Sequence, residues 1–122
     1  MKIEIPLLTR PKKNSQKIWY NPKTKRPMIV QGDKYMQFEK DCAYFMPKLK
    51  VPIDKPVNLK CTFFVPDRKK RDLTNLLNAI QDILVKYGVL LDDNSNIVAG
   101  VDGSRIVYQK GIEKTIIEIE EV

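Results

Sequence analysis

Residues 66–93 read PDRKKRDLTNLLNAIQDILVKYGVLLDD, and this stretch decides the fold. A basic cluster, Arg68 to Arg71, stands directly before Asp72, and an acidic pair, Asp92 and Asp93, closes the stretch. Between them, apolar residues recur at spacings of three and four, which predicts a helix with one continuous face on the core. Those residues are Leu73, Leu76, Leu77, Ile80, Ile83, Leu84 and Tyr87.

Both ends of this helix carry the residues that helix ends prefer. Asp72 suits the N-cap position. Gly88 suits the position just past the C-terminus, where the backbone is often left-handed. On the side away from the core, a polar stripe remains that consists of Asn75, Asn78 and Asp82, with Thr74 beside it.

The acidic residues at the two ends can meet only if the chain reverses sharply at Gly88. The helix from Asp72 to Gly88 is about 24 Å long, whereas the extended chain back to Asp93 covers at most about 17 Å. Two carboxylates that bind one metal ion, at about 2.1 Å per bond, can bridge the remaining distance of about 7 Å. Asp82 lies about 15 Å along the helix from Asp72, too far to share an ion, so we predict a structural or supporting role for it.

The order of these residues resembles that of the RusA-type Holliday junction resolvases, which are small phage-associated endonucleases. The resemblance implies a homodimer that binds four-way junction DNA and nicks it with magnesium. It also implies that Asp72 and Asp93 are catalytic, with Asp92 adjacent. The motifs that carry the resemblance are Pro66-Asp67 followed by basic residues, Asp72-Leu73-x-Asn75-Leu76, Asp82 within the helix, and Gly88 followed by Asp92-Asp93.

Two positions depart from the family's pattern. Thr74 stands where the family has a second aspartate, and its hydroxyl can at most hold a metal-bound water. Asn78 stands where the family has a lysine, so a cation that could stabilise transition-state charge or contact a phosphate is absent there. Both departures bear on the catalytic rate more than on DNA binding.

Phosphodiester hydrolysis needs an activated water and a stabilised leaving oxygen, and a carboxylate-bound metal ion contributes to both. Our hypothesis is that Asp72 and Asp93 bind Mg²⁺, or Mn²⁺ as the alternative ion, and that Asp92 joins them or orients a ligand. Taken alone, Asp72 reads better as an ordinary helix cap and Asp92-Asp93 as an ordinary turn, but their joint occurrence favours the site. The supporting residues are Thr74, Asn75 and Asn78, and the predicted phosphate clamp consists of Arg68, Lys69, Lys70 and Arg71.

Charge is distributed unevenly along the 122 residues, and this favours a nucleic acid as the partner. Residues 1–71 carry 18 Lys and Arg against 6 Asp and Glu, a net charge of +12, whereas residues 72–122 carry 4 against 9, a net charge of −5. Within residues 9–31 there are seven cations and no acidic residue. From this run we predict that Lys12, Lys13 and Lys17 bind DNA.

Trp19 and Tyr20 lie in the middle of the basic run, and Asn21-Pro22 marks a turn. Two interpretations remain open here. Either the rings and cations face nucleic acid and the rings stack on splayed bases, or the segment is a packed hairpin whose lysines are simply solvated.

Several classes of protein are excluded by what the sequence lacks. Histidine is absent and the two cysteines have no CxxC spacing, which argues against zinc sites and histidine-based catalysis. Cys42 and Cys61 fall within apolar patterns and are predicted to be core thiols in a reducing compartment. No apolar run approaches about 18 residues and the N-terminus lacks a signal-peptide pattern, so we expect a cytoplasmic protein with no membrane partner.

The rest of the chain predicts a single α+β domain, with a mixed, largely antiparallel sheet and two main helices packed on it. A second helix is expected from Asp33, which can cap it, to Pro47, which stops it. Its core face is expected to carry Tyr35, Phe38, Cys42 and Phe45. Residues 97–101 and 105–109 are expected to form an antiparallel pair. The other expected strands lie within residues 1–8, 57–65 and 115–120.

A binding module with weakened or lost catalysis is the main alternative to the resolvase, because Thr74 and Asn78 weaken the metal site. It would share the fold and the basic surface and would bind junctions or other nucleic acids without cleaving them. An RNA-binding protein is a third interpretation, because cations alone do not distinguish nucleic acids.

Overall fold

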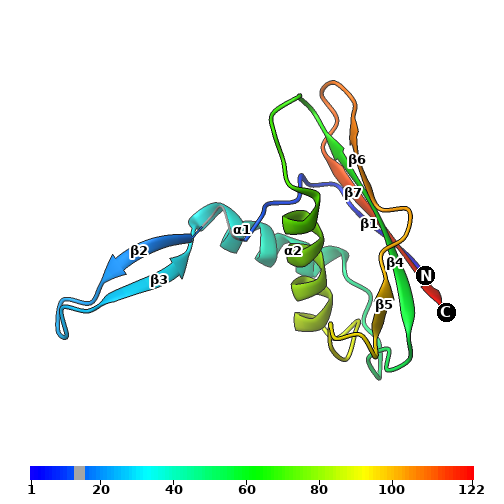
Figure 1. The fold of residues 1–122 in the computed structure, drawn as a ribbon, viewed down its shortest axis with the longest axis horizontal. Helices are drawn as coiled ribbons and strands as arrows, with labels where there is room; N and C mark the ends of the chain where they lie inside the picture. The colour runs from blue at the N-terminus through cyan, green and yellow to red at the C-terminus, as the bar shows by residue number, and fades with distance from the viewer. Residues whose placement is uncertain (13–15) are drawn as a thin grey trace.

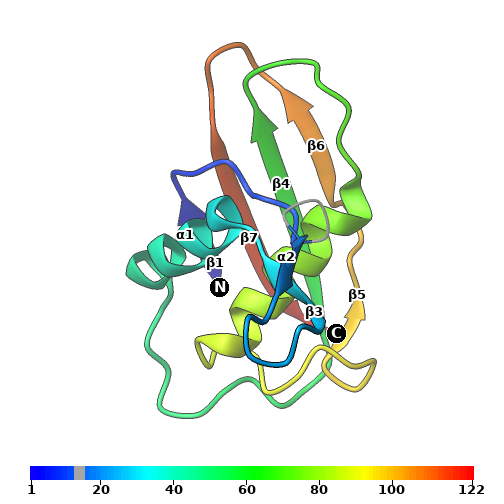
Figure 2. The same cartoon turned by 90° about the vertical axis from the view of Figure 1, so that its left-hand side faces the viewer.

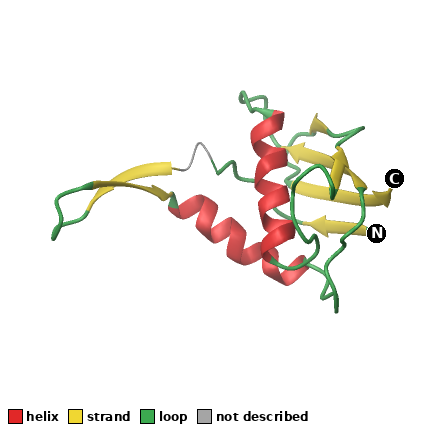
Figure 3. Cartoon of the chain, turned by 60° about the horizontal axis from the view of Figure 1, so that its bottom comes forward, coloured by secondary structure: helices red, strands yellow, loops and turns green. Residues whose placement is uncertain are grey.

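In a computed structural model of the protein, which describes residues 1–12 and 16–122, two helices cover one face of a β-sheet (Figures 1 and 3). The elements in chain order are β1 (Lys2–Ile5), β2 (Gln16–Tyr20), β3 (Pro27–Gln31), α1 (Asp33–Cys42), the 3-10 helix η2 (Ala43–Phe45), β4 (Val57–Val65), α2 (Leu73–Lys86), β5 (Val98–Gly100), β6 (Arg105–Tyr108) and β7 (Lys114–Glu121).

The main sheet is mixed. Strand β7 pairs antiparallel with β1 on one side and with β4 on the other. Strands β5 and β6 both pair in parallel with the second edge of β4. The predicted α+β fold with a mixed sheet and two main helices is therefore confirmed. None of the described helices is long and apolar enough to cross a membrane.

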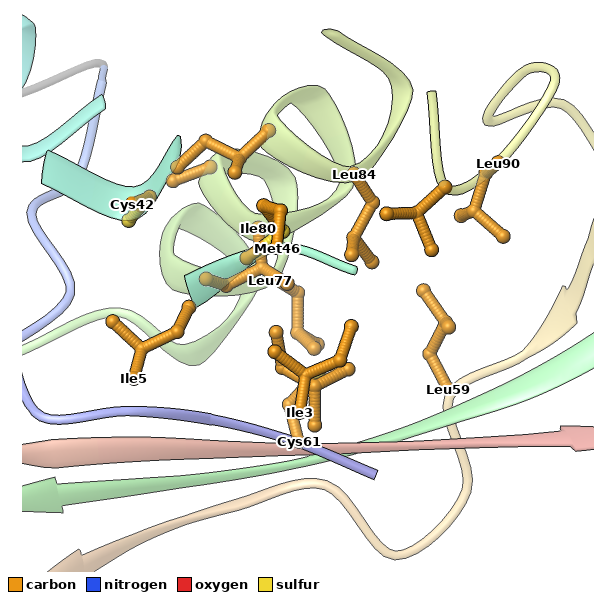
Figure 4. Close-up of a cluster of buried hydrophobic side chains, with 14 of the residues drawn as sticks. Ile3, Ile5, Cys42, Met46, Leu59, Cys61, Leu77, Ile80, Leu84 and Leu90 are labelled. Atoms are coloured by element: carbon orange, nitrogen blue, oxygen red, sulfur yellow. The ribbon is translucent and has the colours of Figure 1, made fainter. Parts of the chain in front are cut away.

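Between the sheet and the helices lies the hydrophobic core (Figure 4). Alternate residues of β4, from Val57 to Val65, are buried, as its alternating sequence predicts. The predicted apolar face of α2 packs on them, with Ile80, Ile83 and Leu84 fully buried. Cys42 and Cys61 belong to this core, and burial raises the pKa of each thiol to about 12. Their prediction as core thiols is confirmed.

The predicted antiparallel pairing of residues 97–101 with 105–109 is wrong. Strands β5 and β6 run in the same direction along one edge of β4, beside its beginning and its end respectively. Asn58 of β4 fixes the corner between them, because its side chain donates to Asp102 O at 3.1 Å and accepts from Asp102 N at 2.9 Å. Gly103 has a φ of +84° in this corner. The two segments therefore form one interrupted edge strand.

Helix α1 differs from its prediction in two details. Its N-cap is Gly32, and Asp33 is the first helical residue. Phe45 lies in η2 and is 37% exposed, so it is not part of the core face. Tyr35, Phe38 and Cys42 are buried as predicted.

Strands β2 and β3 form a hairpin that projects from the body of the molecule (Figure 1). Within the described part of the chain they pair only with each other, with Ile18 opposite Ile29 and Trp19 opposite Met28. A pair of strands without a third partner is marginal in water.

Reversal of the chain after α2 depends on Gly88, whose φ is +73°. The amides of Val89 and Leu90 then both donate to Leu84 O, at 2.9 and 3.2 Å. Leu90 forms an isolated bridge with Ile53 that continues this return. The predicted position of Gly88 just past the helix is confirmed, and the reversal directs Asp92 and Asp93 back beside the helix.

We predict that Gly88→Ala lowers the free energy of unfolding by about 1–2 kcal/mol, because a Cβ disfavours the left-handed conformation. Gly88→Asn should cost less, since Asn tolerates this region better. A Cβ at this position would meet no atom within 4 Å, so packing does not explain the loss. Urea unfolding followed by circular dichroism measures both variants, and equal losses would contradict the backbone argument.

Candidate active site

Asp72 is the N-cap of α2, as predicted. Its Oδ1 accepts hydrogen bonds from Thr74 N at 2.9 Å and Asn75 N at 3.3 Å. No described residue bonds to its Oδ2, and the side chain is exposed. One carboxylate oxygen therefore holds the helix end while the other is available to a ligand.

Asp92 and Asp93 lie in an exposed loop that follows the reversal at Gly88. Both oxygens of Asp92 are engaged, with Oδ1 accepting from Asp93 N at 2.7 Å and Oδ2 from Asn94 Nδ2 at 3.1 Å. Partial desolvation raises the pKa of Asp93, and so do its hydrogen bond with Asp92 and the negative charges of Asp92 and Asp82. Asp92 therefore shapes the loop and increases the negative potential at Asp93.

Asp82 lies on α2 close enough for its charge to act on Asp93. Its Oδ2 is 3.5 Å from Lys12 Nζ. The side chain of Lys12 is 42% exposed and that of Asp82 is 39% exposed. Lys12 thus reaches the polar side of α2 from the N-terminal segment. Asp82 was predicted to be structural or supporting, and its pairing with Lys12 is consistent with either role.

The basic loop before α2 is organised by its last cation. Arg71 Nη1 donates to Asp67 Oδ1 at 2.9 Å, to Asp67 O at 3.4 Å and to Lys69 O at 3.3 Å. Lys69 N also donates to Asp67 Oδ1, at 3.0 Å. The side chain of Arg71 is only 16% exposed, and its hydrogen bonds stabilise the conformation of the loop. Lys69 and Lys70 are exposed.

Arg68 is held by an aromatic residue that sequence reasoning missed. Its guanidinium lies 4.3 Å from the ring centroid of Tyr108, at the end of β6. The two residues are 40 positions apart. Only the pairing of β6 with β4 brings them together, so no local pattern could have indicated the contact.

A cavity of about 170 Å³ lies between the N-terminal segment and the start of α2. Asp72 lines it together with three cations, Arg10, Lys70 and Arg71. At about 30 Å³ per water, it has room for several waters or a small anion. Arg10 was absent from the predicted DNA-binding set, and only its place in a basic run could have suggested it.

The predicted residues therefore fall into groups. Asp72, Lys70 and Arg71 share the cavity, whereas Asp93 is grouped with Asp92 and Asp82. Among residues 1–12 and 16–122, no three acidic or cysteine side chains converge to hold a metal ion. Whether Asp72 and Asp93 share an ion therefore stays a prediction.

Of the other predicted residues, three lie on α2, where Thr74 and Asn78 are exposed and Asn75 is half-buried. Lys17 lies on β2 in the projecting hairpin, in register with Val30. Lys13 lies outside the residues that the structure describes. Figure 2 shows the hairpin in front of the helices, in the view that looks along it.

An exposed carboxylate beside three cations offers an oxygen ligand for a metal ion and positive charge for a phosphate, which is the chemistry that a nuclease needs. Residues 9–120 match the family described as Endodeoxyribonuclease RusA, and the chain belongs to this family. The family resemblance inferred from the sequence is therefore confirmed.

One curated relative is the Crossover junction endodeoxyribonuclease RusA of Aquifex aeolicus (strain VF5). The two sequences are 34% identical over 67 residues, which cover 55% of this chain and 51% of the relative. The matched region thus spans about half the length of that protein.

We predict that Arg71→Gln raises the pKa of Asp67 toward its ordinary value. The hydrogen bond from Arg71 is the largest cause of the present lowering, followed by that from Lys69 N. The pKa of Asp67 is lower in the folded protein than in the unfolded chain. The contact with Arg71 therefore stabilises the fold at pH values above the unfolded-state pKa, and this stabilisation is lost as the pH falls through the folded-state pKa. Carboxyl ¹³C NMR titration measures the shift. Lys70→Gln is the matched control, and an equal shift in that variant would contradict the assignment.

Proposed function

We propose that this protein is a magnesium-dependent, structure-specific endonuclease that resolves four-way DNA junctions by paired symmetric nicks. The observation that carries the proposal is the free Oδ2 of Asp72 beside the cavity lined by Arg10, Lys70 and Arg71. This arrangement places an oxygen that can bind a hard cation next to positive charge that can bind a phosphate. Membership of the RusA family supports the same activity.

The donor chemistry at Asp72 and Asp93 fits magnesium. Mg²⁺ usually takes one or two carboxylates and completes its shell with waters and substrate phosphates, so the lack of a three-carboxylate cluster in the described residues does not exclude it. When bound, the ion would activate water and stabilise the leaving oxygen. Mn²⁺ is the alternative ion.

The chain's own residues supply positioning and charge. Arg10 and Lys70 attract a phosphate toward Asp72, and Arg71 keeps the loop that carries Lys70 in place. Asp92 holds the loop of Asp93 and raises its pKa, so protons compete for Asp93 at a higher pH than for an ordinary aspartate. The backbone amide of Asn75 helps to hold the carboxylate of Asp72 in place, because it donates to Oδ1.

Symmetric nicking requires two equivalent sites, and a twofold homodimer provides them. We therefore propose a homodimer as the active form, bound to one junction. A four-way junction has two strands to cut at related positions, which matches two sites related by a twofold axis.

A nucleic-acid-binding module without catalysis is the second candidate. It is favoured by Thr74 and Asn78, which replace a carboxylate and a cation of the family pattern, and by the absence of a three-carboxylate cluster in the described part of the chain. Both candidates bind DNA with a strong salt dependence. Only the endonuclease produces magnesium-dependent nicks.

We predict that Asp93→Asn and Asp72→Asn each reduce junction cleavage by at least about a hundredfold, because a direct ligand should matter at least as much as the groups that orient ligands. Binding to the junction should be retained. Asn is as good an N-cap as Asp, so Asp72→Asn keeps the helix end while it removes the charge. A labelled synthetic four-way junction, with and without Mg²⁺, measures both quantities.

Linear duplex and Asp54→Asn, an exposed aspartate before β4, serve as controls. Paired nicks by Asp93→Asn at the wild-type rate would overturn its role. Junction-selective binding without any nick by the wild type, across several divalent ions, would favour the binding module.

We also predict that Thr74→Asp lowers the Mg²⁺ concentration for half-maximal cleavage by about tenfold, since an added carboxylate strengthens binding of a hard cation. Thr74→Asn, of similar size but neutral, should leave the requirement near that of the wild type. Magnesium titration of the cleavage rate makes the comparison. An unchanged requirement in Thr74→Asp would show that residue 74 does not face the ion.

A further inference from the structure

The β2–β3 hairpin is the one part of the described chain that forms a sheet of its own, and it projects beyond α1 (Figures 1 and 3). A strand of five residues is about 17 Å long. The tip of the hairpin is therefore held away from the body and from the start of α2, where Asp72 lies.

The turn at the tip has a fixed backbone. Lys25 N donates to Asn21 O at 2.7 Å, and Asn21 N donates to Arg26 O at 3.1 Å. The side chain of Asn21 accepts from Lys23 N at 2.9 Å, and that of Thr24 accepts from Arg26 N at 3.4 Å. Lys25 has a φ of +56°. The turn is thus organised before any partner arrives.

This turn presents positive charge for which the described residues supply no counterion. Lys23, Lys25 and Arg26 are all exposed, and no carboxylate among the described residues pairs with them. Tyr20, at the end of β2, is 66% exposed beside them. A preorganised turn with three unpaired cations is suited to phosphate groups.

We propose that the tip of the hairpin, residues 20–26, binds the phosphate backbone of a duplex arm of the DNA substrate, at a distance from the strand that is cut. This rests on the proposed function and names a second contact surface for the same substrate. Duplex DNA carries one negative charge per about 1.7 Å of its axis, so a compact group of three cations meets several phosphates at once.

The composition of the tip favours DNA over a second copy of the chain. The core of a subunit interface is depleted in charged residues, whereas the tip exposes three cations. Two such tips related by a twofold axis would repel each other. A duplex arm offers the opposite charge to both subunits.

The test compares two triple variants of equal charge. The tip variant is Lys23→Gln/Lys25→Gln/Arg26→Gln. The matched control is Lys48→Gln/Lys50→Gln/Lys55→Gln, which removes three exposed cations from the loop before β4. Fluorescence anisotropy with a labelled four-way junction, in EDTA, gives the affinity over a range of salt concentrations.

Each phosphate contact contributes about 0.9 to the slope of log affinity against log salt. The tip variant should therefore reduce the magnitude of the slope by about two to three, with at least a tenfold weaker affinity at low salt, and the control by less than one. Lys23→Arg/Lys25→Arg should keep the wild-type slope. Equal changes in the tip variant and the control would overturn the proposal.

Sedimentation of the three proteins separates DNA contact from subunit contact. If the tip variant alone loses the dimer, the hairpin is a subunit contact and the proposal is overturned. If the wild type cleaves the junction and the tip variant keeps the wild-type slope of log affinity against log salt, the hairpin contact is overturned but the endonuclease is not. Failure of the wild type to bind any junction would overturn both.

Discussion

Burial of the apolar face of α2 on the sheet is the interaction on which the rest of the structure depends. Ile80, Ile83 and Leu84 are fully buried against β1, β4 and β7, and each such side chain contributes about 1.5–3 kcal/mol. This packing fixes the rotation of α2 about its axis. Its capping aspartate and its polar stripe therefore face the basic N-terminal segment, and the cavity beside Asp72 exists because of that orientation.

Local features of the fold could be predicted from the sequence, and pairings over long sequence distances could not. Neighbouring residues in the sequence determine four of these local features. They are the bounds of β4, the buried face of α2, its cap at Asp72 and the reversal at Gly88. The parallel pairing of β5 and β6 with β4 depends on Asn58, more than forty positions from Asp102. Two contacts in the site also join residues that are far apart in the sequence, and so they could not be predicted from it. These are the contact of Arg68 with Tyr108 and the position of Arg10 beside Asp72.

Charges of the two halves of the chain meet at particular points across the fold. Lys12 pairs with Asp82, Lys60 with Glu118 and Lys114 with Glu4. Exposed pairs of this kind contribute about 0–1 kcal/mol each, so they orient segments more than they stabilise them. Exposed cations outside these pairs include those of the hairpin tip and of the loop before α2, the two surfaces that we propose contact phosphate.

The sequence contains one tryptophan, and it lies on β2 of the projecting hairpin. Intrinsic tryptophan emission from this protein therefore comes from the β2–β3 hairpin. A fluorescence melting curve would follow the hairpin, because no other element of the chain carries a tryptophan. The same residue provides a native optical probe of the hairpin, with no label attached.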